Sequence, residues 1–222
     1  MGLGLLFLFF ATEASAHLAL TAEVGGLVGT FAKAEESLKA TGYAYGFALN
    51  WHPEHKSQVL PFSIGLTGKQ SKLSYMENNI NKDATHNVFG PNLGLYLPIN
   101  ELFIVQIFAQ YYPAATLSTL STNSVVLNSN NFKYATWEAF SGTAAFEGRI
   151  NFTHDKTDGQ FNKKNRFRSG IGVSCLQQTF LKSHTEISTS RDALKPTTTV
   201  SNDKISDRLM LLTVDFFLGL TF

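Results

Sequence analysis

The sequence predicts an all-β protein whose fold is an up-and-down antiparallel β-barrel that spans a membrane. Three observations support this prediction. Apolar side chains occupy every second position in a series of segments, which is the period of a β-strand. The connections between these segments are alternately long and short. Only 16% of the 222 residues are charged, whereas soluble domains carry roughly 25%.

The alternation is clearest in the last segment, LMLLTVDFFLGLTF, residues 209–222. The even-numbered residues from Met210 to Phe222 are all apolar, whereas the other face includes Thr213, Asp215 and Thr221. A strand with one wholly apolar face packs that face against a protein core or against lipid.

Seven further segments alternate in the same way, at residues 18–31, 41–51, 59–69, 87–98, 102–112, 136–152 and 166–180. Each reaches the roughly 9–11 residues that a tilted strand needs to cross a bilayer. Pro91 predicts a bulge or a weakly paired position in its strand, because proline lacks the N–H group. In the sixth segment the period places Phe140 on the same apolar face as Phe146.

Long polar connections follow the third, fifth and seventh segments, at residues 68–86, 113–135 and 181–206. Shorter links follow the second, fourth and sixth segments, so that long loops leave one rim of the barrel and turns leave the other. Outer-membrane barrels have this arrangement, with extracellular loops and periplasmic turns. We expect eight strands, or ten if the loop at 68–86 or the loop at 181–206 contains a hairpin.

The apolar face is assigned to lipid rather than to a core. In a soluble barrel the opposite, glycine-rich face would point to water with few charges to keep it soluble. Facing inward, the same small and polar residues suit the narrow interior of an eight-stranded barrel. After the N-terminus no window reaches the roughly 18 apolar residues of a membrane helix, which excludes a helical membrane protein. The single cysteine, Cys175, excludes an internal disulfide.

The N-terminal stretch MGLGLLFLFFATEASA is typical of a secretory signal peptide. Its short apolar run ends at Phe10 and is followed by Ala14-Ser15-Ala16, an A-x-A cleavage pattern. We therefore expect residues 1–16 to be a signal peptide and residues 17–222 to form one barrel domain.

The terminal alternation that closes on Phe222 resembles the C-terminal signal of bacterial outer-membrane proteins. This resemblance implies that Phe216, Leu218, Leu220 and Phe222 are read by the barrel-assembly machinery. The overall plan resembles the small eight-stranded families typified by the barrel domain of OmpA, OmpX and OmpW. As a similarity of architecture, this resemblance covers the whole mature chain. It implies export through the periplasm to the outer membrane of a Gram-negative bacterium, with outer-membrane lipid and lipopolysaccharide as partners.

The alternation also places charged residues inside the barrel, namely Glu23, Glu147, Arg149, Arg168 and Asp215. An isolated buried ion costs several kcal/mol, so these charges must be paired or hydrated. One hypothesis is an ion-pair plug that stabilises the lumen. The other is a charged constriction in a narrow water path. Asp215, Glu147 and Arg168 are expected to lie close enough to interact.

These features predict a narrow, porin-like channel or a structural surface protein without catalysis. The alternative is a surface adhesion or interaction protein that binds ligands with its long loops; small solutes are possible ligands too. A lipid A-modifying enzyme is a third hypothesis, resting on His184 with Ser183 and Glu186 beside it. Neither a cofactor nor a metal is expected, and the net charge of +1 gives no indication of nucleic-acid binding.

Overall fold

The computed structural model describes residues 16–33, 36–55, 58–59, 61–99, 103–127, 130–154, 166–191 and 197–222. Its strands are β1 (Ala16–Lys33), β2 (Glu36–His55), β3 (Gln58–Val59), β4 (Phe62–Glu77), β5 (Ile80–Pro98), β6 (Phe103–Tyr112), β7 (Ala114–Leu127), β8 (Asn130–Gly142), β9 (Ala145–His154), β10 (Arg166–Arg191) and β11 (Thr197–Thr221). Across these ranges, no helix has the length and apolar character needed to cross a membrane. The expected signal peptide lies outside the described residues except for Ala16, the first residue of β1.

Eight of the strands form a closed barrel, in the order β1, β2, β4, β5, β6, β9, β10 and β11, with β11 pairing back to β1. All of these pairs are antiparallel. The closing pair runs from Ala19 opposite Thr221 to Ala32 opposite Arg208. Closure gives every strand a partner on both sides at the level of the barrel, as a lipid environment requires. The prediction of an eight-stranded barrel is confirmed, and the ten-stranded alternative is wrong.

Strands β7 and β8 extend the barrel wall without adding strands to the ring. β7 pairs with the outer part of β5, and β8 pairs with the outer part of β10. The chain passes from β6 into β7 at Pro113 and from β8 into β9 at Thr143 and Ala144. The long loop expected at 113–135 is therefore largely a β-hairpin that continues the fifth and sixth barrel strands.

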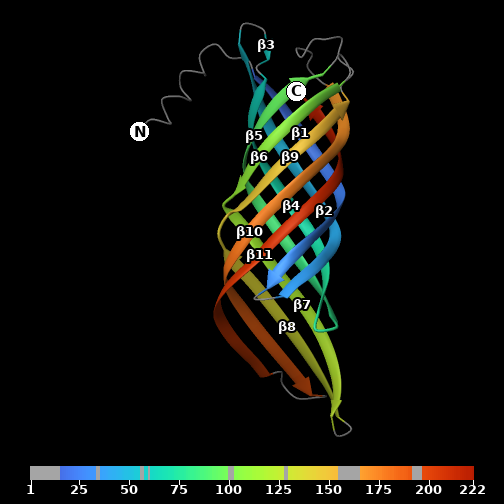
Figure 1. Cartoon of the computed structure of the whole chain (residues 1–222), viewed down its shortest axis with the longest axis vertical. Coiled ribbons are helices and arrows are strands. Elements are labelled where there is room, and N and C mark those ends of the chain that lie inside the picture. Colours follow the sequence, from blue (N-terminus) through green and yellow to red (C-terminus); the bar gives the residue numbers. More distant parts are fainter. Residues whose placement is uncertain are drawn as a thin grey trace, which may run out of the picture.

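The other two long loops are also mostly strand. β4 and β5 are joined by Asn78 and Asn79, whose φ angles of 50° and 61° are those of the turns that favour tight hairpins. β10 continues to Arg191 and β11 begins at Thr197. The prediction that these polar segments are loops is wrong. Ser- and Thr-rich segments form paired strands in water once the barrel fixes their neighbours. Figure 1 shows the β7–β8 and β10–β11 hairpins projecting beyond the rest of the barrel.

The outer surface of the barrel is apolar, as the alternation predicts. In β11 the even-numbered side chains from Met210 to Phe222 are all at least 39% exposed, whereas Thr213 and Asp215 are at most 2% exposed. Cys175 in β10 also faces outward. This surface is the lipid-facing belt, and the fold is a transmembrane β-barrel.

Two local predictions had different outcomes. Pro91 pairs without interruption with β4, but on its other side the partner of β5 changes from β7 to β6 between Phe89 and Asn92. The weakly paired position is thus confirmed on that side. Phe140, in contrast, points into the lumen and is 2% exposed. The expectation that it faces lipid is wrong, because the break between β8 and β9 reverses which parity points inward.

Two adjacent positions of β10 test which side of the strand faces lipid and which faces the lumen. A spin label on the native Cys175 is expected to be accessible to oxygen dissolved in lipid and to show a mobile spectrum. A label on Leu176→Cys, made in a Cys175→Ser background, should be immobilised, because Leu176 is 2% exposed inside the barrel. Electron paramagnetic resonance on refolded protein in vesicles measures both properties. The assigned faces are wrong if the two positions behave alike or in the opposite sense.

Candidate functional site

The lumen is filled by side chains in successive tiers. From the rim with Ala16 and Phe222 toward the projecting hairpins, these are an aromatic cluster, a polar cavity, a charge network, an apolar layer and a group of surface ion pairs. Each tier is built from inward-facing positions of several strands that lie far apart in the sequence. The chemistry of the lumen therefore depends on the register of barrel closure.

Arg149 in β9 is the centre of the charge network. Its Nη2 atom donates to Asp215 Oδ1 at 2.5 Å, and its Nη1 atom forms an ion pair with Glu23. Its Nε atom donates to Asn151 Oδ1 at 2.6 Å. The guanidinium is thus held by strands β1, β9 and β11, with the side chain of Arg149 only 3% exposed. Fork-shaped donation by arginine fixes the two carboxylates in position as well as neutralising them.

A second buried pair joins Lys69 of β4 to Glu147 of β9. Lys69 Nζ lies 2.7 Å from Glu147 Oε1, and their side chains are 4% and 0% exposed. The hydroxyl of Tyr112 donates to the other carboxylate oxygen at 2.8 Å. Lys69 also donates to Ser174 Oγ at 3.3 Å. The pair therefore spans the lumen from one wall to the opposite one.

A glycine provides the space for Arg149 and Asp215. A Cβ atom added at Gly172 would lie 2.6 Å from Arg149 Nη2, 2.6 Å from Asp215 Oδ1 and 2.7 Å from Asn151 Oδ1. These distances are far below van der Waals contact, so any side chain at this position would displace the ion pair. Gly172 is thus part of the site.

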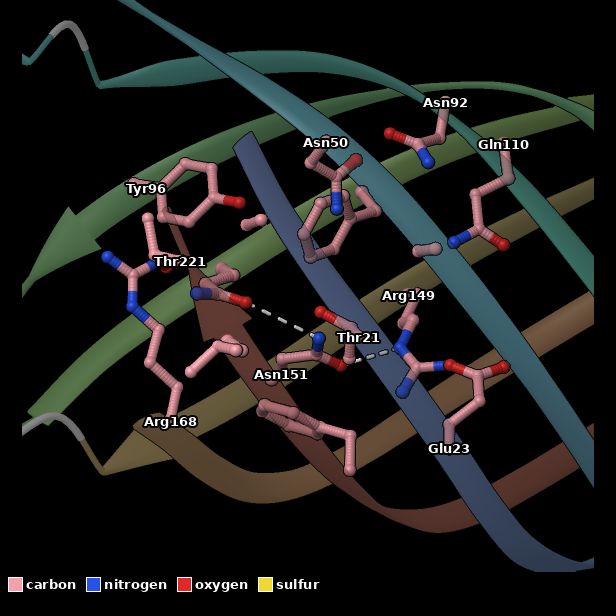
Figure 2. Close-up of a pocket in the computed structure, with 17 residues that line it drawn as sticks. Thr21, Glu23, Asn50, Asn92, Tyr96, Gln110, Arg149, Asn151, Arg168 and Thr221 are labelled. Carbon is pink, nitrogen blue, oxygen red and sulfur yellow. Dashed lines mark hydrogen bonds and ion pairs between the residues drawn. The ribbon is translucent and has the colours of Figure 1, made fainter. Parts of the chain in front are cut away.

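The structure places all five of the predicted lumen charges on the inward face, but it joins them in a different way. Asp215 is paired with Arg149 rather than with Arg168, and Glu147 is paired with Lys69. Arg168 lies near the opposite end of an adjoining cavity, by Tyr96 and Thr221 (Figure 2). The expected contact among Asp215, Glu147 and Arg168 is replaced by these other pairs, because the tilt of the strands sets which residues lie at the same height.

The cavity between the charge network and the rim has a volume of about 30 Å³. It is lined by polar side chains that include Asn50, Asn92 and Gln110 (Figure 2). Asn92 is 2% exposed, and neither of its amide atoms has a protein partner among the described residues. A cavity of this size holds about two water molecules, which suits the unmet amide groups. Beyond it, Tyr96 contacts His52 and Phe108 edge to face, with ring centroids 4.7 and 6.0 Å apart.

An apolar layer crosses the lumen on the other side of the charge network. Its aromatic centre consists of Phe31, Phe140 and Phe180, whose ring centroids lie 5.3 to 6.1 Å apart. These rings are at most 2% exposed and pack with Leu176, Leu209 and other buried side chains from around the barrel. A layer of this kind excludes water and opposes the passage of ions, which would lose their hydration.

Ion pairs cover the apolar layer at the outer mouth. Lys33 Nζ lies 2.9 Å from Glu77 and 3.2 Å from Glu138, and Lys82 pairs with the same two carboxylates. Burial alone would raise the pKa of Glu77, but hydrogen bonds from Lys82 and Lys33 outweigh this effect and lower it. Burial would similarly lower the pKa of Lys33, yet its bond to Glu77 raises it. The group therefore remains charged at neutral pH.

The candidate enzymatic group at His184 has a different arrangement from a catalytic triad. Its Nδ1 and Nε2 atoms are hydrogen-bonded to Asn202 at 2.7 Å and to Glu186 at 3.1 Å. Ser183 pairs with the inward-facing Phe140, whereas His184 is on the outer face. The serine hydroxyl thus lies on the opposite side of the sheet from the imidazole. Among the described residues, no group of His, Cys, Asp and Glu side chains could hold a metal ion.

Two members of the lumen network are absent from the predicted set. The alternation in residues 59–69 puts Lys69 on the inward face with Ser63 and Thr67, so that signal was available. Tyr112 shares its parity with Gln106 and Gln110 and was available in the same way. The four residues of the predicted assembly signal, Phe216, Leu218, Leu220 and Phe222, face outward near the end of β11. Their recognition by an assembly machinery stays a prediction.

Removal of Arg149 tests the charge network. Arg149→Ala leaves Glu23 and Asp215 buried without their shared cation, which is expected to lower the free energy of unfolding by about 3–5 kcal/mol. Urea unfolding of the refolded protein in vesicles, followed by tryptophan fluorescence, measures the change. Lys39→Ala, at an exposed position of β2, is the control and should change stability by about 0.5 kcal/mol or less. Equal stabilities for the two variants would show that the network contributes nothing.

The glycine requirement is tested by a matched pair. Gly172→Ala is expected to destabilise the barrel by about 1–3 kcal/mol, because the methyl group displaces the Arg149–Asp215 pair. Gly148→Ala is the control, since an added Cβ there meets nothing within 4 Å. The same unfolding measurement applies. A Gly172→Ala protein as stable as the Gly148→Ala protein would contradict the packing described here.

Comparison with known proteins gives similarities of fold only. No family model matches the chain, and no curated protein matches it. A structure of Neisserial surface protein A (NspA) is 10% identical, with a TM-score of 0.46 over 95% of this chain and 99% of that one. Ail, the attachment invasion locus protein of Yersinia pestis, is 11% identical, with a TM-score of 0.42 over 92% and 99%. The translocator domain of the autotransporter NalP from Neisseria meningitidis is 8% identical, with a TM-score of 0.36 over 98% and 92%.

Proposed function

We propose that the protein is a closed surface protein of the outer membrane, which acts through the sheet that projects from its outer rim. The observation that carries this proposal is the apolar layer around Phe31, Phe140 and Phe180. It fills the lumen across its width, and these aromatic side chains are at most 2% exposed. A closed lumen leaves the outer surface as the part available for function.

The lengths of the outer strands support a surface role. β10 and β11 contain 26 and 25 residues, whereas about 9–11 residues suffice to cross the bilayer. Together with β7 and β8 they form a four-stranded sheet that rises beyond β1 and β2 (Figure 1). An ordered sheet of this length is more than a connection between strands, and it presents a fixed surface for surface ligands or adhesion.

A channel is the competing function. The polar cavity and the charge network favour it on the periplasmic side, since both could hydrate a narrow path. The apolar layer and the ion pairs of Lys33 and Lys82 argue against it, because an ion would have to cross both. Under the closed-barrel proposal the charge network is a structural plug that stabilises the lumen. The enzymatic hypothesis has less support, because Ser183 and His184 lie on opposite faces.

Planar-bilayer recording tests the proposal. The refolded protein is expected to give no conductance steps, while a general porin reconstituted in the same lipid gives them. Phe31→Ala/Phe180→Ala, which removes two rings from the apolar layer, is expected to raise the leak in vesicle-swelling assays if it folds, as judged by heat-modifiable migration. Reproducible steps from the unmodified protein that change in Asp215→Ala would overturn the proposal in favour of a charge-lined channel.

A further inference from the structure

The outer face of β11 changes character above the lipid-facing belt. Met210 is 51% exposed and is the last apolar residue of the belt on β11. The next outward positions on that strand include Arg208 and, further out, Lys204, both exposed. On β10 the exposed Leu181 is followed directly by the exposed Lys182. Three cations therefore stand where the headgroups of an outer leaflet would lie.

Two of these cations are directly opposite each other. Lys182 and Lys204 are register partners on β10 and β11, which places their Cβ atoms about 4.5–5.5 Å apart. Like charges in this arrangement repel, and an anion held between them would relieve the repulsion. The neighbouring carboxylates of β11 face the other side of the sheet. Asp203 pairs with the inward-facing Ser183, and Asp207 is 2% exposed and also faces inward.

Further from the membrane, the same face carries aromatic and hydrogen-bonding side chains in place of the cations. The His184 ring contacts the exposed Trp137 with centroids 5.7 Å apart, and its nitrogens are hydrogen-bonded to Asn202 and Glu186. Trp137 is directly opposite Glu186 in the register. An exposed indole next to amide and carboxylate groups suits a sugar, whose C–H face stacks on the ring while its hydroxyls bond to the polar groups.

We propose that this face of β8, β10 and β11 binds a phosphorylated glycolipid of the outer leaflet. The three zones occur in the order that such a lipid requires. Its acyl chains lie along the belt below Met210, its phosphates contact Lys182, Lys204 and Arg208, and its sugars reach Trp137 and His184. Arginine and lysine are the usual ligands of phosphate groups, arginine in a bidentate manner. A soluble anion would use only the middle zone, so the full set favours the glycolipid.

This inference rests on the proposed placement of the projecting sheet outside the outer membrane. It does not depend on whether the lumen is closed. Loss of glycolipid binding in a protein that is silent in planar bilayers would refute the inference alone. Conductance in a protein that binds the glycolipid would refute the closed-barrel proposal alone.

Binding is measured with the full mature barrel in phosphatidylcholine nanodiscs. A Trp51→Phe background leaves Trp137 as the single tryptophan, since the chain has two. Purified diphosphoryl lipid A, lipopolysaccharide with its core sugars, and inorganic phosphate are titrated separately while Trp137 emission is followed. We expect saturable binding of both lipids, a larger emission change with the core sugars present, and no response to inorganic phosphate.

The matched variants each remove two positive charges. Lys182→Gln/Lys204→Gln is expected to bind lipid A about thirtyfold more weakly, because each cation near an anionic headgroup contributes about fivefold. Lys39→Gln/Lys72→Gln, on β2 and β4, should bind like the parent protein. Lys182→Arg/Lys204→Arg should retain binding, which separates charge from local folding.

Several outcomes would overturn the inference. Equal weakening by the two glutamine pairs would mean a diffuse electrostatic collar rather than a site. Complete displacement of the lipids by inorganic phosphate would mean that the site binds free anions rather than a glycolipid. Unaltered binding in Lys182→Gln/Lys204→Gln, with folding verified by heat-modifiable migration, would remove the phosphate contacts altogether.

Discussion

Closure of the barrel by β1 and β11 is the constraint on which the rest of the structure depends. In lipid, an unpaired backbone N–H or C=O group costs several kcal/mol, so each strand needs a hydrogen-bonded neighbour on both sides. The register from Ala19–Thr221 to Ala32–Arg208 meets this requirement. It also fixes the tilt of the strands and the height at which each inward side chain enters the lumen. The pairs formed by Arg149 and by Lys69 are consequences of that register.

Once the ring is closed, its narrow interior must be filled. Eight strands leave room for side chains and little else, and the tiers divide this space by chemistry. Buried carboxylates are acceptable only where cations reach them, which Arg149 and Lys69 do from opposite walls. Glycine is needed where two charged groups meet at the wall, as at Gly172. The aromatic layer of Phe31, Phe140 and Phe180 fills the remaining width and separates the network from the outer mouth.

Beyond the membrane the same wall continues in water with different side chains. The belt ends near Met210, and the strands then carry cations, an exposed tryptophan and hydrogen-bonding groups. β10 and β11 remain paired from the barrel wall to Thr189 and Thr197, with one irregularity between Phe180 and Lys182, so the projecting sheet continues the wall beneath it. The lumen below is closed, and the ordered surface above carries several kinds of binding group. Both features support a function at the outer surface of the molecule.

The sequence by itself determined the period of two, and with it the barrel, its lipid-facing side and the identity of most lumen charges. The face to which a side chain points alternates along a strand and depends only on the local chain. It can therefore be predicted wherever a strand is regular, as in residues 209–222. The prediction fails at Phe140, where the break between β8 and β9 reverses the faces. Only the tertiary structure decided that Glu147 pairs with Lys69, 78 positions away, and that Arg168 lies near the opposite end of the cavity from the Arg149 network. It also decided that three polar segments expected as loops are mainly strands. Partners across a lumen depend on strand tilt and closure, which arise from all the strands together and leave no mark on any one of them.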